Sequence, residues 1–265
     1  MQQSHPSILC LSGFDPSGGA GIQADIESIA SMGGHAVPVI TALTVQNTQN
    51  VSHFSPVETQ LFTEQVDMLL DDVAVKAIKI GMVGSLNIIE TISRILKEHS
   101  ELPVIYDPVL AAGGGANLTE TGMLAAIQEL LLPHTTILTP NSPEARLLSN
   151  ETDLDACGKK LMEQGCEAVL LTGTHEDKKH VDNMWFYEGK HIETFSWDRL
   201  PHEYHGSGCT LASAIAALIA QGLDPFNAVN EAQDYSWNTL KHAFKISDKG
   251  QLIPNRFYWQ HAEDE

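Results

Sequence analysis

The stretch HEYHGSGCTLASAIAAL, which begins at His202, holds residue types suited to three kinds of chemistry. His202, His205 and Cys209 are side chains that can bind zinc. The segment Gly206-Ser207-Gly208 can form a phosphate-binding turn. The apolar run that follows is typical of a buried helix, which needs no ligand at all. Residues elsewhere in the chain help to choose among these interpretations.

The zinc interpretation is the weakest of the three. The order is not HExxH, and the turn between His205 and Cys209 keeps these two side chains off a shared helical face. A phosphate turn is favoured, because Gly206–Cys209 opens a helix whose free N–H groups and positive dipole end attract anions. A tight strand-to-helix turn without a ligand remains the alternative.

Cys209 lies at the start of this helix. The N-terminal field favours the thiolate, so the sequence predicts a lowered pKa for Cys209 and a functional role. The alternative is a small buried hydrophobe. We give that second interpretation to the other three cysteines, which are Cys10, Cys157 and Cys166.

Carboxylates at two other places point to a metal. Asp107 ends the apolar run VIY, and a buried carboxylate there needs a donor or a metal. In Asn141-Ser142-Pro143-Glu144, Ser142 is expected to cap a helix and Pro143 to occupy its first position. Asn141 and Glu144 either complete that helix start or offer oxygens to a magnesium–phosphate site.

Two glycine-rich segments allow either a plain loop or a ligand-binding one. The first, GFDPSGGAGIQAD from Gly13 to Asp25, lacks the GxGxxG order of a dinucleotide site. The second, Gly113–Gly115, is either a simple loop or a mobile flap over a phosphate.

Composition limits the choice of partners. The chain has 265 residues, 43% of them hydrophobic and 18% charged, which is ordinary for a globular protein. A net charge of −19 argues against nucleic acid as a partner, although backbone N–H groups and a metal can still hold a small phosphorylated ligand. The start of the chain lacks a basic signal-peptide region, and no apolar run is long enough for a membrane span. We therefore expect a cytoplasmic protein with reduced thiols that does not associate with membranes.

Short apolar runs alternate with segments of helical period. The expected strands are Ser7–Leu11, Ala36–Leu43, Val75–Ile80, Val104–Tyr106, Ile137–Leu138 and Ala168–Leu171. The expected helices are Ala20–Ser31, Glu58–Leu70, Leu86–Glu98, Glu120–Leu131, Pro143–Leu148, Leu154–Gln164 and a helical end from Cys209 to about Phe244. Asn183–Phe195 alternates around Glu188-Gly189 and predicts an edge β-hairpin. This rhythm predicts one α/β domain over residues 1–265, with a mostly parallel, doubly wound sheet between two helix layers.

Polar residues follow the expected strands, at the point where each turns toward a helix. Thr44, Gln46 and Asn47 follow the second strand, and Gly81-Met82 follows the third. Because ligands of open parallel sheets bind beyond the carboxyl ends of the strands, we expect these groups to converge on one site.

Six motifs resemble the hydroxymethylpyrimidine/phosphomethylpyrimidine kinases of thiamin biosynthesis, members of the ribokinase-like superfamily. They are SGFDPSGGAGIQAD, ITALTVQN, KIGM, YDPV, LTPNSPEA and HGSGCTLASAIAA, in the family's order and spacing. The resemblance covers nearly the whole chain. It implies a three-layer α/β/α fold, ATP and Mg²⁺ as cofactors, and two phosphorylations of 4-amino-5-hydroxymethyl-2-methylpyrimidine, first to the monophosphate and then to the diphosphate.

The resemblance also implies a role for each matching residue. Gly206–Cys209 would receive the transferring γ-phosphate, with Cys209 where sugar kinases of the superfamily carry an aspartate base. Asp107, Asn141 and Glu144 would organise Mg-ATP, directly or through water. The implied pyrimidine site comprises Gln46, Asp25, Gly13, Asp15, Ala20, Met82 and Val109. Thr172 and Gly173 would contact the nucleotide.

The chain departs from the family pattern in two places. LAAGGGANL, residues 110–118, lacks the Lys that many relatives carry after DPV, and LTGTHED replaces a KGGH-type stretch. The first departure weakens the expectation for the second phosphorylation. Two rivals stay open: a pyridoxal or pyridoxine kinase of the same superfamily, and a non-catalytic pyrimidine- or nucleotide-binding protein. A homodimer also stays open.

Overall fold

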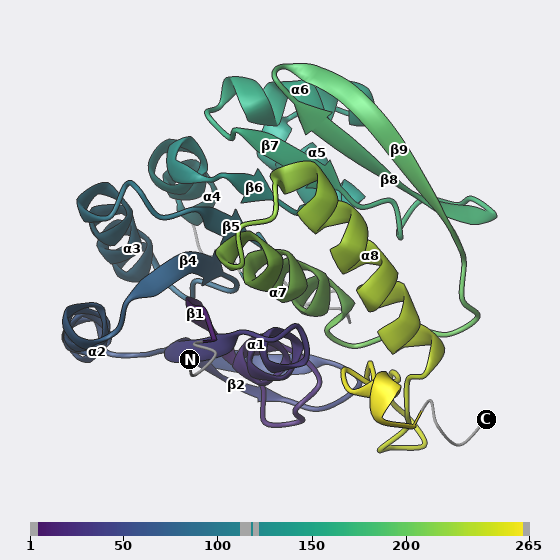
Figure 1. Cartoon of the computed structure of the whole chain (residues 1–265), viewed down its shortest axis with the longest axis horizontal. Helices are drawn as coiled ribbons and strands as arrows, with labels where there is room; N and C mark the ends of the chain where they lie inside the picture. Colours follow the sequence, from purple (N-terminus) through teal and green to yellow (C-terminus); the bar gives the residue numbers. More distant parts are fainter. Residues whose placement is uncertain (1–4, 112–117, 119–121, 262–265) are drawn as a thin grey trace.

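The computed structural model describes residues 5–111, 118 and 122–261, and its strands form one nine-stranded sheet in the order β3-β2-β1-β4-β5-β6-β7-β8-β9 (Figure 1). The strands are β1 (Ser7–Phe14), β2 (His35–Gln46), β3 (Val51–Pro56), β4 (Val75–Ile80), β5 (Val104–Tyr106), β6 (Ile137–Leu138), β7 (Ala168–Leu171), β8 (His180–Tyr187) and β9 (Lys190–Asp198). The neighbouring strands in the run β2-β1-β4-β5-β6-β7 are parallel. At one edge β3 pairs antiparallel with β2, and at the other edge β8 pairs antiparallel with β7 and β9 with β8. The mostly parallel sheet is therefore confirmed.

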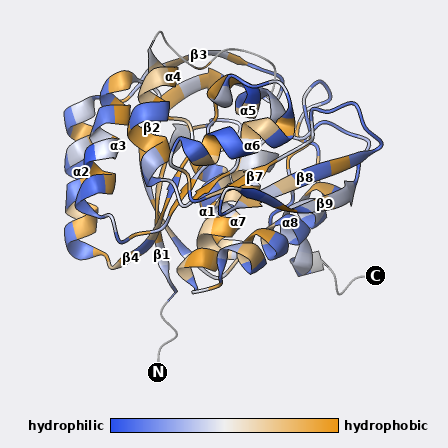
Figure 2. Cartoon of the chain, turned by 90° about the horizontal axis from the view of Figure 1, so that it is seen from above, coloured by the Kyte–Doolittle hydropathy of each residue, from blue (hydrophilic) through white to orange (hydrophobic). Residues whose placement is uncertain are grey.

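Helices cover both faces of the sheet. One layer contains α1 (Gly21–Ser31), α7 (Ser207–Ala220) and α8 (Pro225–Lys241). The other contains α2 (Thr59–Asp72), α3 (Leu86–Glu98), α4 (Met123–Ala126), the π-helix η1 (Ile127–Leu131), the 3₁₀-helix η2 (Leu132–His134), α5 (Ser142–Ser149) and α6 (Leu154–Glu163). A last 3₁₀ turn, η3 (Tyr258–His261), follows near the end of the chain. Figure 2 shows hydrophobic residues along the central strands between the layers.

Side-chain alternation along β1 explains the three layers. Ile8 and Cys10 face the core under α1, α7 and α8, whereas Leu9 and Leu11 face the core under the other layer. A strand buried on both sides in this way reads as a continuous apolar run rather than an alternating one.

The edge hairpin is confirmed. Strands β8 and β9 pair around Glu188 and Gly189, whose φ angles are 50° and 73°. Two consecutive positive φ angles are what a two-residue type I′ hairpin turn requires.

Three expectations about elements need correction. Strand β2 continues to Gln46, so Thr44 and Gln46 lie within the strand rather than after it. Strand β3 was not predicted, because VSHFSP is a polar edge strand without an alternating apolar pattern. The expected helical end is two helices, since α7 stops at Ala220 and Asp224 caps α8. None of the described helices is both long and apolar enough to cross a membrane.

Candidate active site

A cavity of about 450 Å³ lies where β1, β2, β4 and β5 end, beside the start of α7. Its lining includes these predicted site residues: Gly13, Asp15, Ala20, Gln46, Met82, Asp107, Val109, Asn141, Glu144 and Gly206–Cys209. Residues 112–117, which include the predicted flap Gly113–Gly115, lie outside the described residues. The sheet thus brings together groups that are far apart in the sequence, as its parallel topology requires.

The glycine-rich turn before α7 is closely packed. Gly206 has φ 84°, and a Cβ at this position would overlap the carbonyl oxygen of Gly19. Only glycine fits there, because it tolerates a left-handed backbone and has no Cβ. No described side chain caps the helix that Gly206 begins. The first N–H groups of α7 therefore face the cavity beside Ser207, Gly208 and Cys209, in an arrangement that suits an anion.

The predicted low pKa of Cys209 is wrong. Burial, followed by the negative charge of Asp107, raises the pKa of the Cys209 thiol to about 12. These two effects outweigh the charge of Lys79, which lowers the pKa of the thiol. At neutral pH Cys209 is a thiol, and it hydrogen-bonds to the Asp107 carboxylate.

Two carboxylates line the cavity in an environment that calls for a cation. Burial raises the pKa of Asp107, and burial followed by the charge of Asp107 raises the pKa of Glu144 to about 8. Oδ2 of Asp107 is buried without a hydrogen-bond partner among the described residues. A divalent cation would relieve both the repulsion and the unpaired oxygen, so the pair fits Mg²⁺. No described group of three or more His, Cys, Asp or Glu surrounds a common point, so phosphate and water oxygens would complete the shell.

Asn141 and Glu144 also hold the start of α5 through a capping box. Asn141 accepts a hydrogen bond from the Glu144 N–H at 3.0 Å, and Glu144 Oε2 accepts one from the Asn141 N–H at 2.9 Å. The N-cap is thus Asn141 and not Ser142 as expected. Glu144 Oε1 faces the Leu110 N–H at 3.5 Å. One residue pair therefore both fixes the helix and presents oxygens to the cavity.

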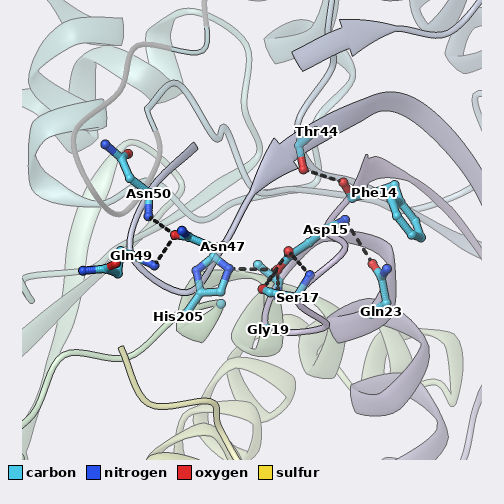
Figure 3. Close-up of polar contacts among 12 residues, drawn as sticks. Phe14, Asp15, Ser17, Gly19, Gln23, Thr44, Asn47, Gln49, Asn50 and His205 are labelled. Carbon is cyan, nitrogen blue, oxygen red and sulfur yellow. Dashed lines mark hydrogen bonds and ion pairs between the residues drawn. The ribbon is translucent and has the colours of Figure 1, made fainter. Parts of the chain in front are cut away.

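Asp15 organises the loop after β1 (Figure 3). Its carboxylate accepts hydrogen bonds from the Ser17 N–H and the Ala20 N–H, each at 2.8 Å, and contacts His205 Nε2 at 2.8 Å. Burial opposes ionisation, but the bonds from His205 and Ser17 lower the pKa of Asp15. Asp15 borders the cavity, but its oxygens are occupied within the protein, so a contact with the pyrimidine stays a prediction.

The prediction that Asp25 binds substrate needs correction. Asp25 is fully buried and does not line the cavity. Its Oδ1 lies 2.7 Å from Lys79 Nζ and 2.7 Å from Ser213 Oγ. Asp25 is the first acidic residue on α1, and the sequence does not reveal its buried cationic partner on β4.

Thr172 and Gly173 lie outside the cavity. The Thr172 N–H donates to Pro140 at 2.9 Å, and the Gly173 N–H donates to Asn183 Oδ1 at 3.1 Å. A Cβ on Gly173 would overlap the carbonyl oxygen of Asp182, which explains the glycine. The assignment of Thr172 and Gly173 to the nucleotide stays a prediction.

Thr44 lines the cavity, as its place near the end of the second strand indicated, whereas His175, Val51 and Leu118 were not predicted as site residues, and His205 was considered only as a zinc ligand. His205 directly precedes the glycine turn, and that position was the available signal for it. Val51 belongs to the unexpected strand β3, so no pattern pointed to it. Neither Lys nor Arg lines the described part of the cavity.

Comparison with known proteins agrees with this geometry. The sequence model of the phosphomethylpyrimidine kinase family matches residues 15–253. A hydroxymethylpyrimidine/phosphomethylpyrimidine kinase of Salmonella typhimurium is 37% identical over 245 residues, which are 89% of this chain and 91% of that protein. A Staphylococcus aureus pyridoxal kinase, solved with AMP-PCP and pyridoxal, is 25% identical with a TM-score of 0.88 over 98% of this chain and 96% of that chain.

A third similar protein is the phosphomethylpyrimidine kinase of Clostridium difficile 630, which has been solved as a crystal structure. It is 29% identical with a TM-score of 0.78, and the match covers 89% of this chain and all of that chain. The central sheet and its helix layers are accordingly those of the ribokinase-like fold. By its sequence and its fold, the chain belongs to the phosphomethylpyrimidine kinase family.

Proposed function

We propose that this protein transfers the γ-phosphoryl group of ATP to 4-amino-5-hydroxymethyl-2-methylpyrimidine, and then phosphorylates the monophosphate to the diphosphate, in thiamin biosynthesis. One observation carries the proposal. A single cavity is lined by the amide of Gln46, the carboxylates of Asp107 and Glu144, and the glycine turn that opens α7. These groups match a flat aminopyrimidine, a metal and a transferring phosphate, respectively.

The pyrimidine pocket follows from the shape and polarity of one wall. Gln46 offers one donor and one acceptor, which complement the amino group and ring nitrogen of an aminopyrimidine. Met82 and Val109 supply apolar surface for a flat ring. Together they would orient the hydroxymethyl group toward Cys209.

Phosphoryl transfer needs positioning and charge stabilisation more than covalent chemistry. The N–H groups at Gly206–Cys209 would hold the γ-phosphate, while Asn141 would contact the nucleotide. Asp107 and Glu144 would hold Mg²⁺, which neutralises phosphate charge when bound. The complex of the similar S. aureus pyridoxal kinase with AMP-PCP supports the use of ATP.

The role of Cys209 follows from its raised pKa. A thiol with a pKa of about 12 does not accept a proton at neutral pH. Cys209 would therefore orient the substrate hydroxyl from beside Asp107 rather than act as a general base. The hydroxyl proton can pass to the transferred phosphate, because a loose transition state makes little demand on a base.

The second phosphorylation has weaker support than the first. The described cavity lining contains no Lys or Arg, and residues 110–118 contain none either. Among the described lining residues, His175 and His205 are the side chains able to carry positive charge near the monophosphate. We expect a lower kcat/KM for the monophosphate than for the free pyrimidine.

Pyridoxal is the second candidate substrate, because the similar S. aureus enzyme was solved with pyridoxal bound. Measuring kcat/KM for the hydroxymethylpyrimidine and for pyridoxal side by side, at saturating Mg-ATP, tests the proposal. We expect the pyrimidine to be preferred. A clear preference for pyridoxal would overturn the assignment. A cytoplasmic location and a homodimer stay predictions, open to fractionation and light scattering.

A further inference from the structure

A buried arginine near the end of the chain lies behind the proposed phosphate site. The side chain of Arg256 is completely buried, although Arg256 lies 15 residues after Lys241, the last residue of α8. In Figure 1 the C-terminal segment returns beside α1 after α8. None of the sequence patterns marked Arg256 as a site residue.

The guanidinium group contacts the loop after β1 directly and reaches the glycine turn through the first turn of α7. Nη2 donates to the carbonyl oxygen of Gly19 at 2.6 Å, and Nε donates to Thr210 Oγ1 at 3.0 Å. The Thr210 hydroxyl in turn donates to the carbonyl oxygen of Gly206 at 2.9 Å. The third contact, from Nη1 to Glu27 Oε2 at 3.0 Å, points outward to a half-exposed carboxylate.

These contacts meet at the tightest point of the site. The Gly19 oxygen that accepts from Arg256 is the atom that a Cβ on Gly206 would overlap. Arg256 therefore fixes Gly19 from one side while Gly206 packs against it from the other. Through Thr210 it also fixes the carbonyl oxygen of Gly206. The planar guanidinium group of Arg256 thus sets the distance between the loop after β1 and the glycine turn.

The segment before Arg256 is anchored to neighbouring loops by main-chain bonds. The Leu252 N–H donates to Glu203 at 3.0 Å, and the His205 N–H donates to Leu252 at 2.8 Å. The Gln251 N–H donates to Thr48, two residues beyond Gln46, at 2.9 Å. The C-terminal segment is therefore bound to the residues just before the glycine turn and just after β2, and these bonds hold Arg256 in place.

We infer that Arg256 is a positioning residue for phosphoryl transfer, which keeps the Asp15–Ala20 loop and the Gly206–Cys209 turn at the separation that the γ-phosphate and the acceptor hydroxyl need. This inference rests on the proposed function. A fixed relation between the two loops matters because misplacement of reacting groups by about 1 Å can cost about 100-fold in rate.

The test compares nucleotides with and without a γ-phosphate. Dissociation constants for ADP and AMP-PCP are measured with Mg²⁺ by calorimetry, alongside kcat and Tm. For Arg256→Met we expect ADP affinity within about twofold of wild type, AMP-PCP affinity weaker by about tenfold and kcat lower by about 10- to 100-fold, since bonds from charged donors are lost. Arg256→Lys should recover part of both losses.

Glu27→Gln is the matched control, because it removes only the charge of the outward partner and keeps an acceptor oxygen. It should leave both affinities and kcat within about twofold. Equal losses for ADP and AMP-PCP in Arg256→Met, or no loss in either, would show a merely structural arginine and overturn the inference.

Thr210→Val provides a second route if Arg256→Met does not fold. Thr210→Val removes the hydroxyl that connects Arg256 to the carbonyl oxygen of Gly206, and it should weaken the affinity for AMP-PCP more than the affinity for ADP. Unchanged or equally changed affinities would contradict the inference. Failure of the proposed function is distinguishable, because it appears in the wild type as absence of phosphorylated product. That result would remove the inference as well.

Discussion

The ammonium group of Lys79 lies 2.7 Å from Oδ1 of Asp25, and both side chains are fully buried directly behind the cavity. Lys79 also donates to Ser12 Oγ at 3.1 Å, and Ser12 lines the cavity. The ion pair thus joins β4 to α1 beneath the site. A buried pair of this kind stabilises only as long as both partners are present.

Asp25→Asn should therefore destabilise the protein by about 3–5 kcal/mol, because Lys79 is left as a buried unpaired charge. Urea unfolding measures the change. Asp67→Asn is the control, since it removes the exposed pair with Arg94 and should cost less than about 1 kcal/mol. Similar values for both variants would contradict the structural role assigned to Asp25.

Gly206→Ala should lower kcat by at least about 100-fold, because the new Cβ displaces the turn from the Gly19 oxygen. Gly222→Ala is the matched control: Gly222 has φ 93° but open space around a Cβ. It should carry only the conformational cost of about 1–2 kcal/mol in stability, with normal kcat. Equal kcat values for the two variants would show that the close approach to Gly19 is unimportant.

Cys209→Ala should lower kcat by about 10- to 100-fold and change ATP affinity by less than about twofold, since one orienting hydrogen bond is lost. Cys209→Ser keeps a neutral donor and should retain kcat within about tenfold. Cys166→Ala, at a buried site elsewhere, should leave kcat unchanged. A loss of about 100- to 10,000-fold in Cys209→Ser would indicate a thiolate base instead.

Glu144→Gln should stabilise the metal-free protein increasingly as the pH rises. The pKa of Glu144 is raised to about 8, so its contribution to stability is present below the unfolded value near 4.5 and is lost as the pH rises through 8. The difference in free energy of unfolding between Glu144→Gln and wild type, measured by urea unfolding, should therefore grow from pH 5.5 to about 8, at a rate of up to about 1.4 kcal/mol per pH unit, and then level off. A difference that stays constant with pH would argue against a buried, repelled carboxylate.

Gln46→Leu should raise the KM for the pyrimidine by about 10- to 100-fold, because two hydrogen bonds to the heterocycle are lost. The KM for ATP should not change. Val45→Leu is a control on the same strand with an exposed side chain, and its kinetics should match wild type. An unchanged pyrimidine KM in Gln46→Leu would mean that the amide faces elsewhere.

Most of the sheet could be predicted from sequence because its central strands are apolar on both faces. Val75–Ile80, Val104–Tyr106, Ile137–Leu138 and Ala168–Leu171 have the predicted bounds. Strand β3 could not be predicted, since His53 and Ser55 are exposed at an edge where no apolar pattern is required. The extension of β2 to Gln46 depends on pairing with β3, so it was missed for the same reason.

The cavity could be predicted as far as topology determines it. Groups at the ends of parallel strands had to converge, and Asp107 and Gln46 did, while Gly206 joins them from the start of α7. The partners of Asp25 and Asp15 could not be predicted, because Lys79 and His205 approach from distant elements. The pKa of Cys209 depends on burial beside Asp107, which a local reading of the helix start does not include.

The most direct test is product analysis by mass spectrometry, with the hydroxymethylpyrimidine and its monophosphate offered separately to the purified protein with ATP and Mg²⁺. We predict monophosphate from the first substrate, diphosphate from the second, and faster turnover of the first. Absence of phosphorylated product from either substrate would contradict it and would favour a non-catalytic pyrimidine-binding protein.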